Sequence, residues 1–61
     1  MNDFKPKRYV VEMCNDQIKQ FEAAGDTAAV DRLERVRNGY IMAELTPKEV
    51  IMELYNLLFV K

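Results

Sequence analysis

The feature that most constrains this chain is that its 61 residues include one cysteine, Cys14, and no histidine. A chain this short buries only about 60% of the surface that its unfolded form exposes. Small domains usually compensate with disulfides, a metal ion or a partner subunit. One cysteine cannot form a disulfide within the chain, and a tetrahedral zinc site needs more thiol or imidazole ligands than are present. Stability is therefore expected to come from helix packing or from oligomerisation.

The composition is that of an ordinary globular domain, with 49% apolar and 31% charged residues. The formal net charge of −1 provides no overall attraction to nucleic acid or to a membrane. No apolar run approaches the roughly 20 residues that span a bilayer, and no apolar signal segment follows the basic residues near the start. Because a single unpaired thiol is typical of reducing compartments, the expected location is the cytoplasm.

A first helix is predicted over about 7–24, after a polar lead-in at 1–6, because apolar residues recur there at helical spacing. Gly25 is expected to end it by supplying a left-handed cap. In an alternative interpretation, the segment Arg8–Val11 is a β-strand, and a strand followed by two helices is the plan of ribbon-helix-helix DNA binders. The helical period continues from Val11 to Gly25 without a break, which favours the helix.

A second helix is predicted over about 27–43, with Asp26 or Thr27 as its N-cap. Asn38-Gly39 is a stop signal inside this segment. The apolar period nevertheless runs through it, which favours a continuous helix over one that ends at Asn38.

The third helix has the clearest start in the sequence, because Thr46-Pro47-Lys48-Glu49 is a capping box with proline at the first helical position. This helix is predicted over about 47–59. The fold class expected for 1–61 is thus all-α, a single three-helix domain in which a helical hairpin is followed by a C-terminal helix. The domain is expected to be dimeric.

The dimer is expected because apolar residues cover about 220° of the third helix, and contact with the other two helices requires roughly half that width. The excess side chains would form an exposed apolar patch in a monomer, which small soluble proteins tend to avoid. They are predicted to form an intermolecular surface, and they comprise Ile51, Met52, Tyr55 and Phe59. In the alternative interpretation, the third helix is central and the other two helices cover both of its flanks.

Two residues of the second helix, Arg37 and Tyr40, are also predicted to belong to this interface. Arg37 lies near the middle of the apolar stripe, beside Tyr40, and is interpreted as a partner contact. The alternative is that Arg37 lies at the edge of the helix with its apolar stem along the surface and its charge in water.

Catalytic chemistry finds little support in the sequence. There is no serine, no histidine and no glycine-rich phosphate loop, and the carboxylates fall on the polar sides of the predicted helices. Cys14 lies in the middle of an apolar stripe, where a small buried residue is expected rather than a nucleophile. No enzymatic activity, cofactor or metal ion is therefore expected.

The expected function is that of a small, non-enzymatic intracellular regulator or adaptor that binds protein, either a second copy of itself or an unidentified protein. No interaction with a membrane is expected. The alternative is a small DNA-binding regulator that contacts phosphates with a basic N-terminal arm formed by Lys5, Lys7 and Arg8.

Overall fold

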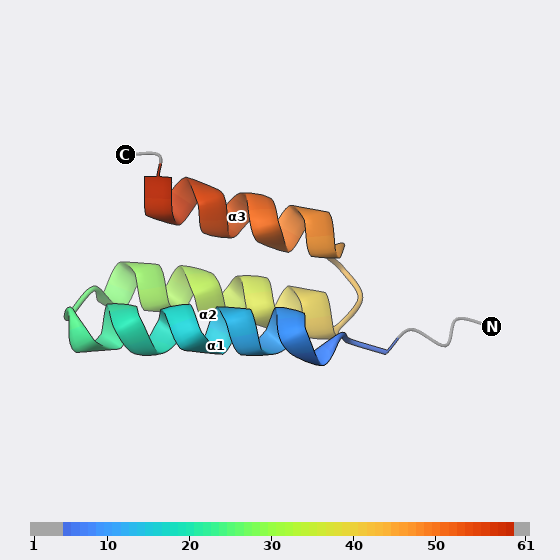
Figure 1. Cartoon of the computed structure of the whole chain (residues 1–61), viewed down its shortest axis with the longest axis horizontal. Coiled ribbons are helices and arrows are strands. Elements are labelled where there is room, and N and C mark those ends of the chain that lie inside the picture. The colour runs from blue at the N-terminus through green and yellow to red at the C-terminus, as the bar shows by residue number, and fades with distance from the viewer. Residues whose placement is uncertain (1–4, 60–61) are drawn as a thin grey trace.

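The computed structural model of the chain describes residues 5–59, and these form three α-helices. They are α1 (Arg8–Ala23), α2 (Thr27–Ile41) and α3 (Pro47–Phe59), and the described residues contain no strand (Figure 1). The prediction of an all-α chain is confirmed. The β-strand alternative is wrong, because Arg8 begins α1. Residues 1–4 of the predicted lead-in and residues 60–61 lie outside the described range.

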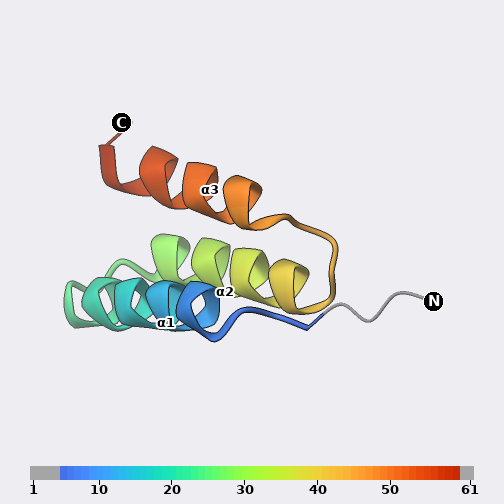
Figure 2. The ribbon, with the colours of Figure 1, turned by 45° about the vertical axis from the view of Figure 1, so that its right-hand side comes forward.

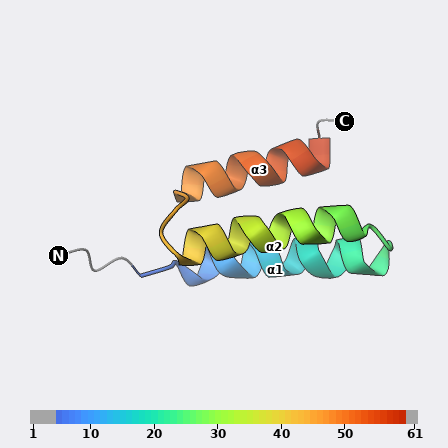
Figure 3. The ribbon, with the colours of Figure 1, turned by 180° about the vertical axis from the view of Figure 1, so that it is seen from behind.

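The three helices lie roughly alongside one another, and each runs opposite to the one before it in the chain (Figures 1 and 3). α1 and α2 are side by side in every view. α3 runs along α2 and diverges from it towards its own C-terminal end, which is also visible in the turned view of Figure 2. One side of α3 is therefore covered by the α1–α2 pair, and no described segment lies on its opposite side.

The turn between α1 and α2 is built around Gly25, whose φ of 76° is in the left-handed region that glycine adopts without steric cost. The Asp26 N–H donates to the Phe21 carbonyl at 2.9 Å, and the Gly25 N–H donates to the Glu22 carbonyl at 3.1 Å. These two bonds form a Schellman motif. The Asp26 carboxylate then accepts a bond from the Ala29 N–H at 3.1 Å, so Asp26 is the N-cap of α2.

α2 ends with the same turn geometry, although the residue at the left-handed position is an alanine. Ala43 has φ of 64°. The Glu44 N–H donates to the Gly39 carbonyl at 2.8 Å, and the Ala43 N–H donates to the Tyr40 carbonyl at 3.0 Å. A side chain at this backbone angle places Cβ too close to the following carbonyl oxygen, so the turn is strained in a way that the turn at Gly25 is not.

Gly39 lies inside α2 and does not interrupt it. A Cβ at this position would lie 3.2 Å from Cδ1 of Leu45, which is closer than ordinary van der Waals contact. The missing side chain thus makes room for Leu45 to pack against α2 immediately before α3 begins.

α3 starts as the capping box predicts. The Thr46 N–H donates to the Glu49 carboxylate at 2.8 Å, and the Glu49 N–H donates to the Thr46 hydroxyl at 3.2 Å. Two backbone groups that have no partner within the helix are therefore satisfied reciprocally.

All three helices contribute to one small hydrophobic core. α3 supplies only two buried side chains, whereas α1 supplies three and α2 supplies four. α3 is therefore held to the other helices by fewer buried side chains than hold α1 and α2 together. The core consists of Val10, Cys14, Ile18, Leu33, Val36, Tyr40, Val50 and Leu54.

Candidate functional site

α3 has two apolar sides, and only one of them is buried. A helix turns by about 100° per residue, so Val50 and Leu54 fall on one side and point towards α1 and α2. Four large apolar residues on the adjoining side are at least half exposed, and Leu58, which is 40% exposed, lies between them and the buried side. We call this surface the α3 apolar face, and it consists of Ile51, Met52, Tyr55 and Phe59.

The exposure of these four side chains is large for residues of their type. It is 50% for Ile51, 56% for Met52, 57% for Tyr55 and 68% for Phe59. The rings of Tyr55 and Phe59 lie one helical turn apart, with centroids 5.0 Å apart and planes tilted by 43°. This spacing is within the range of favourable aromatic pairs, so each ring limits the movement of the other.

A shallow groove of about 220 Å³ adjoins the α3 apolar face where α3 passes α1. Met13 and Gln17 line it from α1, and Leu54 and Leu58 line it from α3 together with three members of the face. Gln17, which interrupts the apolar stripe of the first helix, is therefore at the edge of the core and beside this groove. The face and the groove together form one continuous surface with few polar groups.

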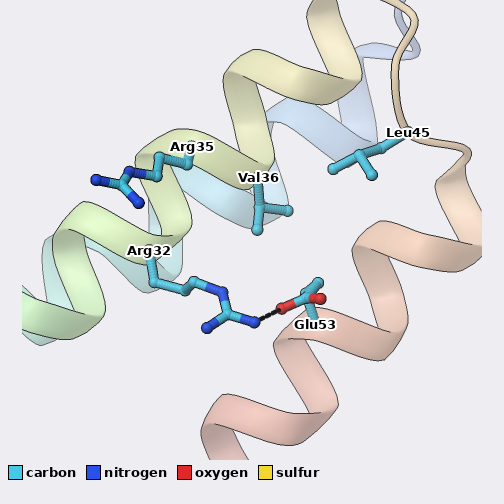
Figure 4. A pocket seen from close by; sticks show the side chains of 5 residues that line it. All are labelled: Arg32, Arg35, Val36, Leu45 and Glu53. Atoms are coloured by element: carbon cyan, nitrogen blue, oxygen red, sulfur yellow. Dashed lines mark hydrogen bonds and ion pairs between the residues drawn. The ribbon is translucent and has the colours of Figure 1, made fainter.

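The opposite flank of α3 is polar and tied to α2. The Arg32 guanidinium donates to the Glu53 carboxylate at 2.6 Å (Figure 4). Both side chains line a hollow of about 270 Å³ together with Arg35, Val36 and Leu45. The Arg35 side chain extends away from α3 (Figure 4). This ion pair joins residues that are 21 positions apart, so the short-range charge patterns of the sequence did not indicate it. It lies on the side of α3 that faces α2, beside the buried contacts made by Val50 and Leu54.

Tyr40, which the sequence places at the predicted interface, lies in the core of the described chain. Its side chain is fully buried in the core, and its hydroxyl accepts a bond from the Lys7 backbone N–H at 2.8 Å. This bond joins the start of α1 to the end of α2. Tyr40 therefore links the two helices at the end of the pair that is opposite the Gly25 turn. Sequence periodicity placed it on the correct side of α2 but could not show how far the core extends along that side.

Arg37 is half-buried, and its guanidinium is used within the chain. It donates to the side-chain oxygen of Asn15 at 2.8 Å, across the contact between α1 and α2, and to that of Asn38 at 3.4 Å. Arg37 was predicted to contact a partner, but its guanidinium already makes these bonds within the chain. Arg37 also lies on α2 and is not part of the α3 apolar face.

The basic residues of the predicted arm are exposed. Lys5 and Lys7 precede α1, and Arg8 is its first residue. The Arg8 guanidinium pairs with the Glu12 carboxylate at 2.6 Å, which partly neutralises its charge.

Cys14 is fully buried among core residues. Burial raises the pKa of its thiol above the ordinary value, and the positive charge of Arg37 opposes this effect only in part. A buried thiol with a raised pKa is a poor nucleophile, because the thiolate is the reactive form. Among the described residues, no group of three histidine, cysteine or acidic side chains could hold a metal ion, and no helix could cross a membrane.

Comparison with protein families, with curated proteins and with solved structures finds no match for the chain.

Proposed function

We propose that this protein is a non-enzymatic regulator or adaptor that works by binding protein, and that it does so as a homodimer formed through the α3 apolar face. The observation that carries the proposal is the half to two-thirds exposure of four large apolar side chains on one side of one helix. Contiguous exposed apolar surface of this kind marks interaction sites. The cytoplasmic location suggested by the lone cysteine is part of the same proposal.

The size of the face fits a weak dimer. Aromatic side chains carry about 150–250 Å² each, so the exposed parts of Tyr55 and Phe59 amount to about 250 Å². Ile51 and Met52 are half exposed and bring the total to about 450–500 Å² per copy. Two copies would bury about 1,000 Å², which is near the lower limit for a specific interface. For an interface of this size, the free energy gained by burying apolar surface exceeds the free-energy cost of association by only a small amount. We therefore expect a dissociation constant in the micromolar range.

Sedimentation equilibrium over about 1–500 µM protein tests the proposal. The wild type should pass from monomer to dimer within this range. The double variant Tyr55→Ser/Phe59→Ser should remain monomeric, and it should keep its helical circular dichroism because both side chains lie outside the core. Its monomer stability should change little for the same reason.

Tyr9 provides a matched control, because it is an aromatic residue of similar exposure, 62%, on a different helix. The variant Tyr9→Ser should dimerise like the wild type. A wild type that stays monomeric throughout the range contradicts the homodimer. Equal dimerisation of the wild type and the double variant would show that another surface is used.

A further inference from the structure

One charged residue lies in line with the α3 apolar face. Lys48, Met52, Tyr55 and Phe59 are spaced i, i+4, i+7 and i+11, so they form a single seam along α3. This spacing is that of the apolar seam of two packed helices. Lys48 is exposed at the N-terminal end of the seam, and Phe59 is exposed at its C-terminal end. The two ends of the seam therefore differ chemically.

We propose that two copies of the chain pair along this seam with their α3 helices antiparallel, so that Lys48 of each copy lies on the ring of Phe59 of the partner subunit. In this arrangement Met52 contacts Tyr55 of the partner subunit. The proposal rests on the proposed homodimer and specifies its geometry.

Charge distribution favours the antiparallel arrangement over the parallel one. In a parallel pair the two Lys48 ammonium groups would be neighbours and would repel each other. In the antiparallel pair each ammonium group lies at the C-terminal end of the other α3, where the unpaired carbonyls carry partial negative charge. The same position places it over an aromatic ring, which attracts cations.

A single two-fold axis accommodates both contacts. An axis that passes between the two α3 helices at the level of residues 53 and 54 pairs position 48 with 59 and position 52 with 55, because each pair is symmetric about that level. The thioether of Met52 then meets the ring of Tyr55, a favourable combination of a polarisable sulfur and an aromatic group. A two-fold interface requires such self-complementarity, since the same surface serves both copies.

The first test is disulfide trapping between two single variants, Lys48→Cys and Phe59→Cys. They are mixed in equal amounts at a concentration where sedimentation shows dimers, and are then oxidised with a glutathione redox buffer. Cys14 stays in place, because it is fully buried. In the antiparallel pair, positions 48 and 59 of different copies are neighbours. Two copies of position 48 are instead separated by 11 residues, about 16 Å along the helix. Disulfides require Cα atoms within about 7 Å.

Mass spectrometry distinguishes the products, because the two variants differ in mass. The 48–59 heterodisulfide should exceed either homodisulfide by about tenfold or more. Predominance of the homodisulfides would establish a parallel pair and overturn the inference while leaving the homodimer intact. Dimers that form no disulfide would also overturn it, since the contact would then lie elsewhere. A chain that is monomeric at all concentrations would overturn the proposed homodimer as well.

The second test leaves Phe59 in place and changes the charge at Lys48. Lys48→Glu should raise the dissociation constant of the dimer by about fivefold or more, because the change acts twice in a symmetric pair. Lys48→Arg should stay within about twofold of the wild type, because arginine also binds aromatic rings. The control Lys19→Glu makes the same charge change at an exposed position of α1 and should have little effect. Equal dissociation constants for the wild type and Lys48→Glu would overturn the inference.

Discussion

Replacing Ala43 by glycine should stabilise the protein, because this residue holds a left-handed backbone angle at the end of α2. Ala43 is exposed, so the substitution removes no core packing. The two bonds of the turn are made by backbone groups and remain available to glycine.

The magnitude follows from two opposing effects. A left-handed angle costs an L-residue about 1–2 kcal/mol, and glycine avoids this cost. Glycine also gives the unfolded chain more freedom, which removes about 0.5–1 kcal/mol of the gain. The free energy of unfolding should therefore rise by about 0.5–1 kcal/mol. For a chain of this size, that is an increase in Tm of about 2–8 °C.

Thermal and urea melts followed by circular dichroism measure the effect, with all variants at the same protein concentration because dimerisation contributes to stability. Ala24→Gly is the matched control, because Ala24 is also an exposed alanine at a helix end but has φ of −84°. It should lower the free energy of unfolding, and Gly25→Ala should lower it by about 1 kcal/mol. If Ala43→Gly melts at or below the wild type, as Ala24→Gly should, the argument from backbone strain is wrong.

Three other perturbations test separate parts of the structure. Thr46→Ala should lower the free energy of unfolding by about 1 kcal/mol in urea melts, because it removes the acceptor for the Glu49 N–H; an unchanged midpoint would mean that the cap contributes nothing. Stability should fall as the pH rises above the ordinary cysteine pKa of about 8.5, because the unfolded chain then loses the Cys14 proton while burial keeps the folded thiol protonated. Cys14→Ala should weaken this part of the pH dependence, and an identical profile in both proteins would rule out the thiol as its cause. The DNA-binding alternative predicts a complex with duplex DNA at low salt that dissociates steeply as salt increases. The arm has few basic residues and Arg8 is paired to Glu12, so we expect gel-shift titrations to show no complex at tens of micromolar protein. A salt-sensitive complex that is lost when Lys5, Lys7 and Arg8 are changed to alanine would favour the DNA-binding alternative.

Much of the local structure could be predicted because the signals for it are local. The turn at Gly25 and the start of α3 at Thr46 depend on residues within one helical turn of each other. The exposed side of α3 could also be predicted, since it follows from the number of apolar residues around one helix.

Features that depend on contacts between helices could not be read from the sequence. The ion pair between Arg32 and Glu53 could not be predicted from their spacing in the sequence, because it joins two separate helices. Tyr40 was assigned to an interface because periodicity gives the side of a helix but not the depth of burial there. Ala43 carries no signal for a left-handed angle, since alanine is the best helix former and the angle is imposed by the turn around it.

The most direct test of the central claim, that the α3 apolar face joins two copies, is an isotope-filtered NMR experiment. A sample prepared from equal amounts of ¹³C-labelled and unlabelled protein reports only contacts between different copies. We predict intermolecular contacts between the Met52 methyl group and the Tyr55 ring, and none that involve Tyr9, which lies on α1. The absence of intermolecular contacts at Met52 and Tyr55 in a sample shown to be dimeric, or contacts centred on Tyr9 instead, would contradict the claim.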